Sequence, residues 1–380
     1  MTICLGMIVK NEAHILPTTL ENICKYIKLD YWVISDTGST DATKELIYQF
    51  FNDRKIPGEL IQHPWVDFST NRNHVIHHAQ QKADYMLMFD ADDSFVGDLV
   101  LPPVLTEDAY LLTFGQGLTY TRPTLFSLKK SWKYVGVLHE SLESADSTTR
   151  RAFLVEGKYH VVSGRTGNRN KNPRKYQDDA ELLEKAILTE TDEALKNRYI
   201  YYCAQSYRDF QDKENAYRMY KIFLDSNGSS MEKYNSCIEL ARICFDLNKA
   251  EEAQTFLCRT ITYDSERIEG IIMLMERLHT QKNHLLINAL YHKCKGYNRR
   301  QSHKTFYMPE LYDYVLEAFN SVSAPQVGDP ASGYECCKKV IMYSKNKTNV
   351  STCLNNLPAF KAFLDKDPAF KAYMETNFKQ

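Results

Sequence analysis

The sequence predicts an α/β domain with a mostly parallel sheet, followed by an all-α domain of helical repeats. Three observations support this class. Short apolar runs alternate with helical periodicity up to about residue 175, strand-like runs fade beyond Tyr176, and one helical pattern recurs at an offset of 37 positions. A chain of 380 residues is also too long for one ordinary core. We therefore expect an α/β domain at residues 1–175, helical repeats at 176–300 and a C-terminal helical extension at 301–380.

The first domain is expected to alternate strands and helices along the chain. Strands are expected at 3–9, 31–35, 59–62 and 85–89, and helices at 12–27, 41–51 and 69–81. Strands joined through helices are parallel, and the helices cover both faces of the sheet. The carboxyl ends of the four strands then share one edge, where ligands bind in open α/β sheets.

Composition excludes several classes of function. Lys plus Arg total 47 against 48 Asp plus Glu, so the chain lacks the basic surface of a nucleic-acid binder. The amino terminus has no basic segment before its apolar run, and no apolar stretch is long enough to cross a bilayer, which favours a cytoplasmic protein without a membrane span. The ten cysteines include no C-x-x-C pair and are expected to be reduced, without a zinc site or disulfides.

The most informative segment is the apolar run Tyr85 to Phe89, which ends in three carboxylates within four residues, Asp90, Asp92 and Asp93. Clustered negative charge is costly unless a cation compensates it. A hard divalent metal, Mg²⁺ or Mn²⁺, prefers oxygen ligands and is often shared with the phosphates of a substrate. The alternative is an acidic turn after a strand, because Asp is common in turns.

A second polar group follows the strand at 31–35. Asp36 stands at the end of this strand, and Gly38 permits a tight turn before the next helix. Asp36 is a candidate to accept hydrogen bonds from a nucleobase or ribose, unless it only organises the turn together with Asp41. A dinucleotide site is disfavoured, because Lys10-Asn11-Glu12 follows the first strand in place of a glycine-rich turn.

These segments resemble, in order and spacing, the motifs of family 2 glycosyltransferases with the GT-A fold. The stretch from Trp132 to Glu140 is similar to the tryptophan-to-His-Glu segment of a bacterial-type subgroup. The resemblance covers roughly residues 1–175, and the helical region beyond it resembles the tetratricopeptide-like tail that some members carry. It rests on five segments: Met7–Glu12, Ser35–Asp41, Asn71–Asn73, Phe89–Asp93 and Trp132–Glu140.

The resemblance implies an inverting, metal-dependent enzyme that moves a hexose from a nucleotide sugar, UDP-glucose or another UDP-hexose. Asp36 would contact the uracil or ribose, and Val9 to Glu12 would form the side of that pocket. Arg72 would lie near the base and the acidic edge, where a guanidinium orients carboxylates, unless it makes a purely structural ion pair.

The resemblance also implies a site for Mn²⁺ or Mg²⁺. Asp90 and Asp92 match the two acidic positions of the D-x-D motif, so Asp92 would reach the metal directly while Asp90 binds ribose or the metal. His139 is a candidate third ligand, unless it merely ends a strand. The metal would stabilise the charge that develops on the diphosphate leaving group.

Inversion requires a general base that takes the proton from the acceptor. Glu140 is the first candidate, because it follows the candidate ligand His139, and Asp93 is the second. The sequence has no signature of the processive synthases, so transfer of one or a few sugars is expected.

Residues 164–175 are polar, basic and glycine-containing, and they include no acid. One interpretation is a lid, in which Arg165, Arg169 or Lys171 closes on the diphosphate and excludes water. The other interpretation is a solvated linker between domains.

The offset of 37 positions relates two helical hairpins, close to the tetratricopeptide period of about 34 residues. A third hairpin is expected between Arg267 and Lys295. Such repeats commonly bind a peptide, so we expect a protein, peptide or glycan acceptor, with a homodimer as another role for the helices. The recurring positions are Ala204, Tyr207, Phe210 and Ala216, matched by Ala241, Cys244, Leu247 and Ala253.

Two other classes of function stay open. A nucleotidyltransferase acting on sugar phosphates also holds a metal beside phosphates, but its usual glycine-rich loop after the first strand is missing. A helical-repeat scaffold with an inactive GT-A domain is the other. The joint presence of Asp36, Asp90, Asp92 and the pair His139-Glu140 argues against that scaffold.

Overall fold

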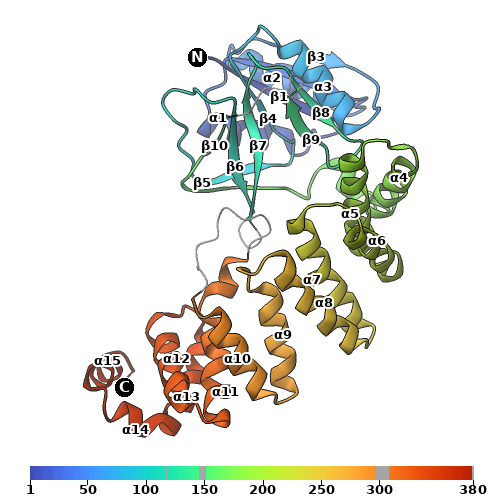
Figure 1. Cartoon of the computed structure of the whole chain (residues 1–380). Helices are drawn as coiled ribbons and strands as arrows, with labels where there is room; N and C mark the ends of the chain where they lie inside the picture. Colours follow the sequence, from blue (N-terminus) through green and yellow to red (C-terminus); the bar gives the residue numbers. More distant parts are fainter. Residues whose placement is uncertain (116–118, 145–150, 297–307, 379–380) are drawn as a thin grey trace. The chain divides into compact units, whose positions relative to one another are not determined.

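A computed structural model describes residues 1–115, 119–144, 151–296 and 308–378 (Figure 1). The chain divides into two compact units, Met1–Gly228 and Ser229–Gln380. The first unit contains the α/β region together with the helices that follow it up to residue 225, and the second is helical. The predicted fold class is therefore confirmed. The expected functional boundaries at 175 and 300 stay predictions, and the expected start of the extension at 301 lies outside the described residues.

The described residues of the first unit form a nine-stranded mixed sheet in which most pairings are parallel. Its order is β3-β2-β1-β4-β7-β6-β11-β5, with β10 beside β6. The first four strands of the chain pair in parallel, as predicted, whereas β7 runs antiparallel to β4 and β6. The bounds are β1 Ile3–Val9, β2 Tyr31–Asp36, β3 Gly58–Gln62, β4 Tyr85–Met88, β5 Ser94–Asp98, β6 Ala109–Phe114, β7 Tyr120–Ser127, β10 Ala152–Leu154 and β11 Lys158–Val162.

Different elements cover the two faces of this sheet. Because side chains alternate along a strand, Leu5 of β1 packs with Leu20 of α1 and Phe51 of α2, whereas Cys4 packs with Val75 of α3. The bounds are α1 Leu16–Tyr26, α2 Thr43–Asp53 and α3 Phe68–Ala79. A small hairpin, β8 Trp132–Val135 and β9 Ser141–Ser144, joins α3 on its face. The carboxyl ends of β1, β2 and β4 are followed by loops.

The first unit continues into helices that start at acidic caps. Asp192 accepts a hydrogen bond from Leu195 N, and Asp212 accepts one from Asn215 N, which satisfies backbone donors at the helix starts. The turn between β8 and β9 contacts the helix that Asp192 caps, because Val137 N donates to Tyr199 Oη of that helix at 3.1 Å. The bounds are η1 Asn168–Lys171, α4 Lys175–Thr189, α5 Glu193–Asp209 and α6 Lys213–Asp225.

In the second unit, α9 and α10 lie within the third hairpin predicted between Arg267 and Lys295. The recurring positions have the same environment in both hairpins. The four alanines are buried, as are Tyr207 and its match Cys244, whereas Phe210 and its match Leu247 are exposed. The tetratricopeptide class stays a prediction. The bounds are α7 Ser230–Asp246, α8 Ala250–Tyr263, α9 Glu269–Thr280, α10 His284–Cys294, η2 Pro309–Tyr312, α11 Val315–Ser323, η3 Ala324–Val327, α12 Pro330–Tyr343, α13 Lys347–Asn356, η4 Leu357–Phe360, α14 Lys361–Leu364 and α15 Pro368–Phe378.

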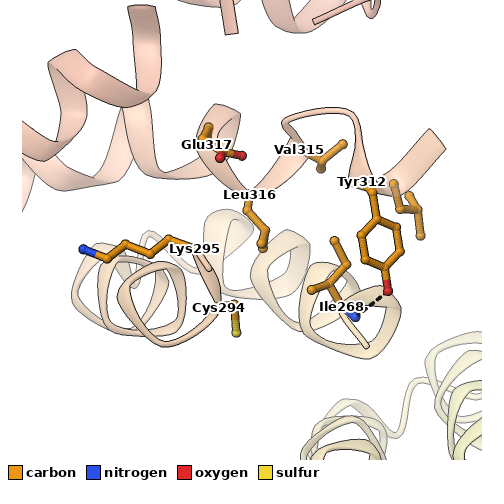
Figure 2. Close-up of a pocket in the computed structure, with 8 residues that line it drawn as sticks. Ile268, Cys294, Lys295, Tyr312, Val315, Leu316 and Glu317 are labelled. Atoms are coloured by element: carbon orange, nitrogen blue, oxygen red, sulfur yellow. Dashed lines mark hydrogen bonds between the residues drawn. The ribbon is translucent and has the colours of Figure 1, made fainter. Parts of the chain in front are cut away.

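A buried polar cluster orders the start of α9. Arg267 and Glu269 form an ion pair at 3.0 Å, and Tyr234 Oη donates to Glu269 at 3.2 Å. Tyr312 Oη accepts a hydrogen bond from Ile268 N beside a small cavity (Figure 2). This cavity of about 10 Å³ holds no more than one water molecule, so it does not indicate a ligand site.

The structure bears on two further features of the sequence. The ten cysteines all fall within the described ranges and are free thiols. No helix among residues 1–115, 119–144, 151–296 and 308–378 is long and apolar enough to cross a membrane.

Candidate functional site

The carboxyl ends of β1, β2 and β4 meet as predicted and bring acidic residues to one edge of the sheet. Val9 and Asp36 are register partners, and Phe89 N donates to Gly6 O at 3.0 Å. Asp36 is only 2% exposed, and its carboxylate accepts a hydrogen bond from Ser39 N at 3.1 Å. Asp36 thus organises the turn after β2, and its contact with a base or ribose stays a prediction.

The loops after β1 and β2 are bonded to each other. Asn11 has a φ of 57° and donates its backbone N–H to Ser39 Oγ at 2.9 Å. Its side-chain oxygen accepts from Thr40 N at 2.7 Å, while Glu12 N donates to Thr43 Oγ1 at 2.8 Å. The two loops therefore form one wall, which fixes the buried Glu12 at the acidic edge.

Arg72 ties α3 to the acidic cluster and to the segment after β8. Its guanidinium pairs with both Asp90 and Glu140, and the side chains of Arg72 and Glu140 are each 6% exposed. The rings of Phe68 and Tyr134 lie 5.8 and 5.3 Å from the guanidinium carbon. The structure thus realises the structural ion pair that was one of the two expected roles of Arg72.

The three aspartates of the cluster differ in protonation because their neighbours differ. Burial works to raise the pKa of Asp90, but Arg72 and Arg122 outweigh it and hold that pKa below its usual value. Burial and the charge of Asp90 raise the pKa of Asp93 to about 8. At neutral pH, Asp90 is therefore ionised beside two cations, whereas Asp93 holds its proton.

Residues 163–171, called the strap below, lie directly on the acidic edge. Gly167 N donates to Asp92 Oδ2 at 3.1 Å, and Asn168 N donates to Glu12 Oε1 at 3.0 Å. A Cβ added at Gly164 would stand 1.8 Å from the backbone oxygen of Asp92, so only glycine permits this approach. Burial raises the pKa of both Asp92 and Glu12. The segment predicted as a lid or linker therefore packs on the site.

The basic residues of the strap have separate environments. Arg169 pairs with Asp179 of α4, and its guanidinium carbon lies 5.1 Å from the ring of Phe68. Arg165 and Lys171 are exposed. Arg169 is thus engaged by Asp179 of α4. The predicted contact of Arg165, Arg169 and Lys171 with a diphosphate stays a prediction.

His139 lies in the tight turn between β8 and β9, with a φ of 54°. Its ring stacks on Tyr202 of α5 at 4.0 Å, and its carbonyl accepts from Arg198 Nε at 2.7 Å. The residue as a whole is exposed, but crowding around the ring and nearby cations, Arg198 first, lower the pKa of His139 to about 3. The imidazole is therefore neutral at pH 7.

The acidic edge fits a divalent cation through few protein ligands. No three His, Cys, Asp or Glu side chains in the described part of the chain are gathered around one metal position, so His139 does not stand with Asp90 and Asp92 as a preformed set. Mg²⁺ and Mn²⁺ often take only one or two carboxylates and complete their shell with phosphates and water. Asp92 would meet that need, because the donors to its carboxylate, Gly167 N at 3.1 Å and Asn170 Nδ2 at 3.4 Å, are neutral and do not cancel its charge.

Several residues of the site were not predicted. Arg122 comes from β7, and Arg198, Tyr199 and Tyr202 come from α5. No local pattern marks Arg122, because its place depends on the antiparallel pairing of β7 with β4 and β6. No local pattern marks the α5 residues either, because they reach the turn between β8 and β9 only through tertiary contacts.

One protein-family model matches the first part of the chain. The model of the family described as Glycosyl transferase family 2 matches residues 4–109. This range contains Glu12, Asp36, Arg72 and the cluster from Asp90 to Asp93. It excludes the strap and the pair His139-Glu140. A comparison with curated proteins found no match.

The solved structures that match this chain include S. aureus TarS, a mannosyltransferase and MamA. S. aureus TarS 1-349 in complex with UDP-GlcNAc is 14% identical, with a TM-score of 0.32 over 87% of this chain and 93% of that chain. The mannosyltransferase PcManGT from Pyrobaculum calidifontis, in complex with GDP-Man and Mn²⁺, is 12% identical, with a TM-score of 0.35 over 73% and 79%. MamA is 12% identical, with a TM-score of 0.34 over 46% and 94%.

Proposed function

We propose that this protein is an inverting, metal-dependent glycosyltransferase that moves a hexose from a UDP-hexose, such as UDP-glucose, to a protein, peptide or glycan. The observation that carries this proposal is the gathering of Glu12, Asp36, Arg72, Asp90 and Asp92 at one sheet edge, inside the region that matches the family model. A site for a nucleotide and a metal-bound diphosphate needs this combination of buried acids beside a fixed cation.

The donor nucleotide is assigned to the wall formed by the loops after β1 and β2. Asp36 has both carboxylate oxygens near Ser39 N, at 3.1 and 3.2 Å, and each oxygen retains acceptor capacity for a ribose hydroxyl or uracil N–H. Val9 and Glu12 supply the side of this pocket. Arg72 holds Asp90 in one orientation toward the ribose and the diphosphate.

Asp92 is assigned as the direct metal ligand, with Asp90 as its partner. These two carboxylates would hold Mn²⁺ or Mg²⁺, which would supply positive charge for the diphosphate leaving group. The strap then has to release Asp92 Oδ2 from Gly167 N–H. When the strap moves in this way, Arg165 and Lys171 are expected to contact the diphosphate. His139, a neutral imidazole, remains a candidate further metal ligand.

Asp93 is the better general base of the two candidates. Glu140 is committed to Arg72 in a buried ion pair, and removing it from that pair would leave the guanidinium with less compensation. Asp93 has a pKa of about 8, raised by burial, and a base is most effective when its pKa lies near the working pH. Asp93 holds its proton at neutral pH in the metal-free protein, so a cation at Asp92 would first have to favour its ionised form, which then has the proton affinity to take the acceptor proton.

The test is UDP release from a panel of UDP-hexoses in the presence of Mn²⁺, with EDTA as the control. The proposal expects release with at least one UDP-hexose and loss of release with EDTA. Asp92→Ala should abolish release while the fold stays intact by circular dichroism. The matched control is Asp53→Ala at the exposed end of α2, which should release UDP at the wild-type rate. Release that survives EDTA and the Asp92 change would contradict the proposal.

A further inference from the structure

One of the three tryptophans is exposed near the candidate site. Trp32 and Trp132 are 3% and 6% exposed, and their indole N–H groups donate to Ile56 O at 3.1 Å and Ser127 O at 2.8 Å. Trp65 is 44% exposed, and its indole N–H has no hydrogen-bond partner among the residues that the structure describes. Trp65 therefore presents both an apolar ring face and a donor to the solvent.

The loop that carries Trp65 is held in place by a buried amide. Asn71 is fully buried in α3, donates its side-chain N–H to Pro64 O at 3.2 Å and accepts from Val66 N at 3.1 Å. These two bonds clamp the backbone on both sides of Trp65. Asp67 then caps α3 by accepting from Thr70 N at 2.6 Å. An exposed aromatic on a fixed loop loses little conformational entropy on binding, which favours a recognition role.

Trp65 is connected to the acidic edge through two contacts. Its ring meets the ring of Phe68 edge to face, with centroids 4.8 Å apart. The guanidinium carbons of Arg72 and Arg169 lie 5.8 and 5.1 Å from that same Phe68 ring. Arg72 pairs with Asp90, and Arg169 belongs to the strap. Trp65 therefore stands at the rim of the proposed donor site and beside the segment that covers it.

We propose that Trp65 is a stacking platform for a saccharide acceptor, an inference that rests on the proposed glycosyltransferase function. One face of a pyranose ring carries C–H groups that pack on the ring face of an indole, and its hydroxyls pair with hydrogen-bonding groups around it. The exposed indole N–H supplies one such group at the edge of the ring. A purely apolar partner would bury this N–H without an acceptor, so the surface suits a sugar better than a hydrophobic protein face.

The position of Trp65 favours the acceptor over the donor. Of the residues assigned to the nucleotide, Glu12 follows β1 and Asp36 ends β2, and the loops after these two strands are bonded into one wall. Trp65 follows β3, the last strand on that side of the sheet, and leads into α3. The acceptor must enter from outside the donor pocket, and a rim platform next to Arg72 and the strap meets that requirement.

Fluorescence provides a direct binding test, because acrylamide reaches only the exposed indole. Quenching is measured with cellotriose, chitotriose and mannotriose added separately, and with UDP plus Mn²⁺ alone. The proposal expects at least one trisaccharide to reduce the quenching constant about twofold or more in the wild type and to have no such effect in Trp65→Phe. It is wrong if no trisaccharide protects the indole, or if UDP plus Mn²⁺ protects it equally without a saccharide.

Steady-state kinetics with the protecting trisaccharide give the second test. Trp65→Ala should raise the KM for the acceptor about tenfold and the KM for the UDP-hexose less than twofold, and Trp65→Phe should recover most of the acceptor affinity. Tyr48→Ala is the matched control, because Tyr48 is an aromatic of α2 with 46% exposure, and it should behave as wild type. An unchanged acceptor KM in Trp65→Ala overturns the platform, whereas absence of any wild-type UDP release overturns the proposed function.

Discussion

At the scale of single residues, the site depends on how buried charges compensate one another. Arg72 carries one cation into a region that holds Asp90 and Glu140, and it is almost fully buried there. Removing one partner of such a group leaves the others uncompensated, which costs more than the net contribution of the pair itself. Arg72 is therefore as important for the stability of the first unit as for its chemistry.

Replacing Arg72 tests this view of the charge arrangement. Arg72→Ala should lower the free energy of unfolding by about 3–5 kcal/mol, because Asp90 and Glu140 lose their shared cation. The control is Arg54→Ala, which breaks an exposed pair with Glu21 and should cost no more than about 1 kcal/mol. Urea denaturation measures both. Equal stability of the two variants would show that the buried ion pair has no special role.

The raised pKa of Asp93 gives a pH dependence whose sign is fixed. A carboxyl whose folded pKa of about 8 lies above the unfolded value of about 3.9 stabilises the fold at low pH and loses that effect as the pH rises through 8. In metal-free protein, Asp93→Asn should therefore stabilise by roughly 1–3 kcal/mol near pH 9, because the amide stays neutral. Near pH 4 the variant should match wild type. A thermal melt in EDTA at both values measures this, and a gain at pH 4 alone would contradict it.

At the scale of elements, the turn between β8 and β9 is held by α5. Arg198 and Tyr199 bond to the backbone of His139 and Val137, and Tyr202 stacks on the His139 ring. Both Gly136 and His139 have positive φ in this turn, at 114° and 54°. A strained turn persists only when its surroundings hold it, so α5 determines where Glu140 meets Arg72.

A change in α5 should therefore be felt in catalysis. Arg198→Ala removes the donor to the His139 carbonyl and should lower kcat for UDP-hexose turnover about tenfold, because small displacements of supporting groups misalign a site. Arg198→Lys keeps a cationic donor and should recover part of the rate. Arg208→Ala, at the other end of α5, serves as the control and should keep the wild-type kcat. The same loss in both alanine variants would mean that α5 acts only through stability.

The elements that could be predicted from the sequence are those encoded by local patterns. The strands that deliver Asp36 and Asp90 are apolar runs with turns behind them, so both their type and the edge they share could be inferred. Arg72 is expected at this edge through the resemblance, but the other partners of these acids could not be inferred. Arg122 reaches them through pairing between distant strands, and the docking of Gly167 on Asp92 depends on tertiary contacts across 75 positions. The role of Arg72 as the counter-ion of Glu140 likewise required the arrangement of α3 against β8 and β9.

At the scale of the whole molecule, all the candidate site residues belong to the unit Met1–Gly228. Every group assigned to the site precedes α6 in the chain. These groups are the donor wall, the acidic cluster, the strap and the supporting residues of α5. The residues from Ser229 onward supply none of the groups assigned to the donor. We therefore expect the first unit to be sufficient for donor binding and for the saccharide contact at Trp65, with the second unit left for further acceptor contacts or for assembly.

Truncation tests this division of labour. A chain ending at Gly228 should bind UDP in the presence of Mn²⁺ with an affinity within about threefold of the full chain, because every donor residue is retained. A chain ending at Lys175 keeps the acidic cluster but lacks α5, and it should lose binding because the turn at His139 loses its support. Isothermal titration calorimetry measures both. If the chain ending at Lys175 binds UDP and the chain ending at Gly228 does not, the proposed role of α5 in donor binding is wrong.

The most direct test of the central claim is the thermal stability of the full chain with UDP and Mn²⁺, each alone and together. If the acidic edge is a nucleotide-sugar site, the two together should raise Tm clearly more than the sum of their separate effects, because a ligand that binds only the folded state stabilises it. Asp92→Asn should abolish the joint increase while its ligand-free Tm stays close to wild type. No joint increase in the wild type, or the same increase in Asp92→Asn, would contradict the assignment of this edge as a metal-dependent donor site.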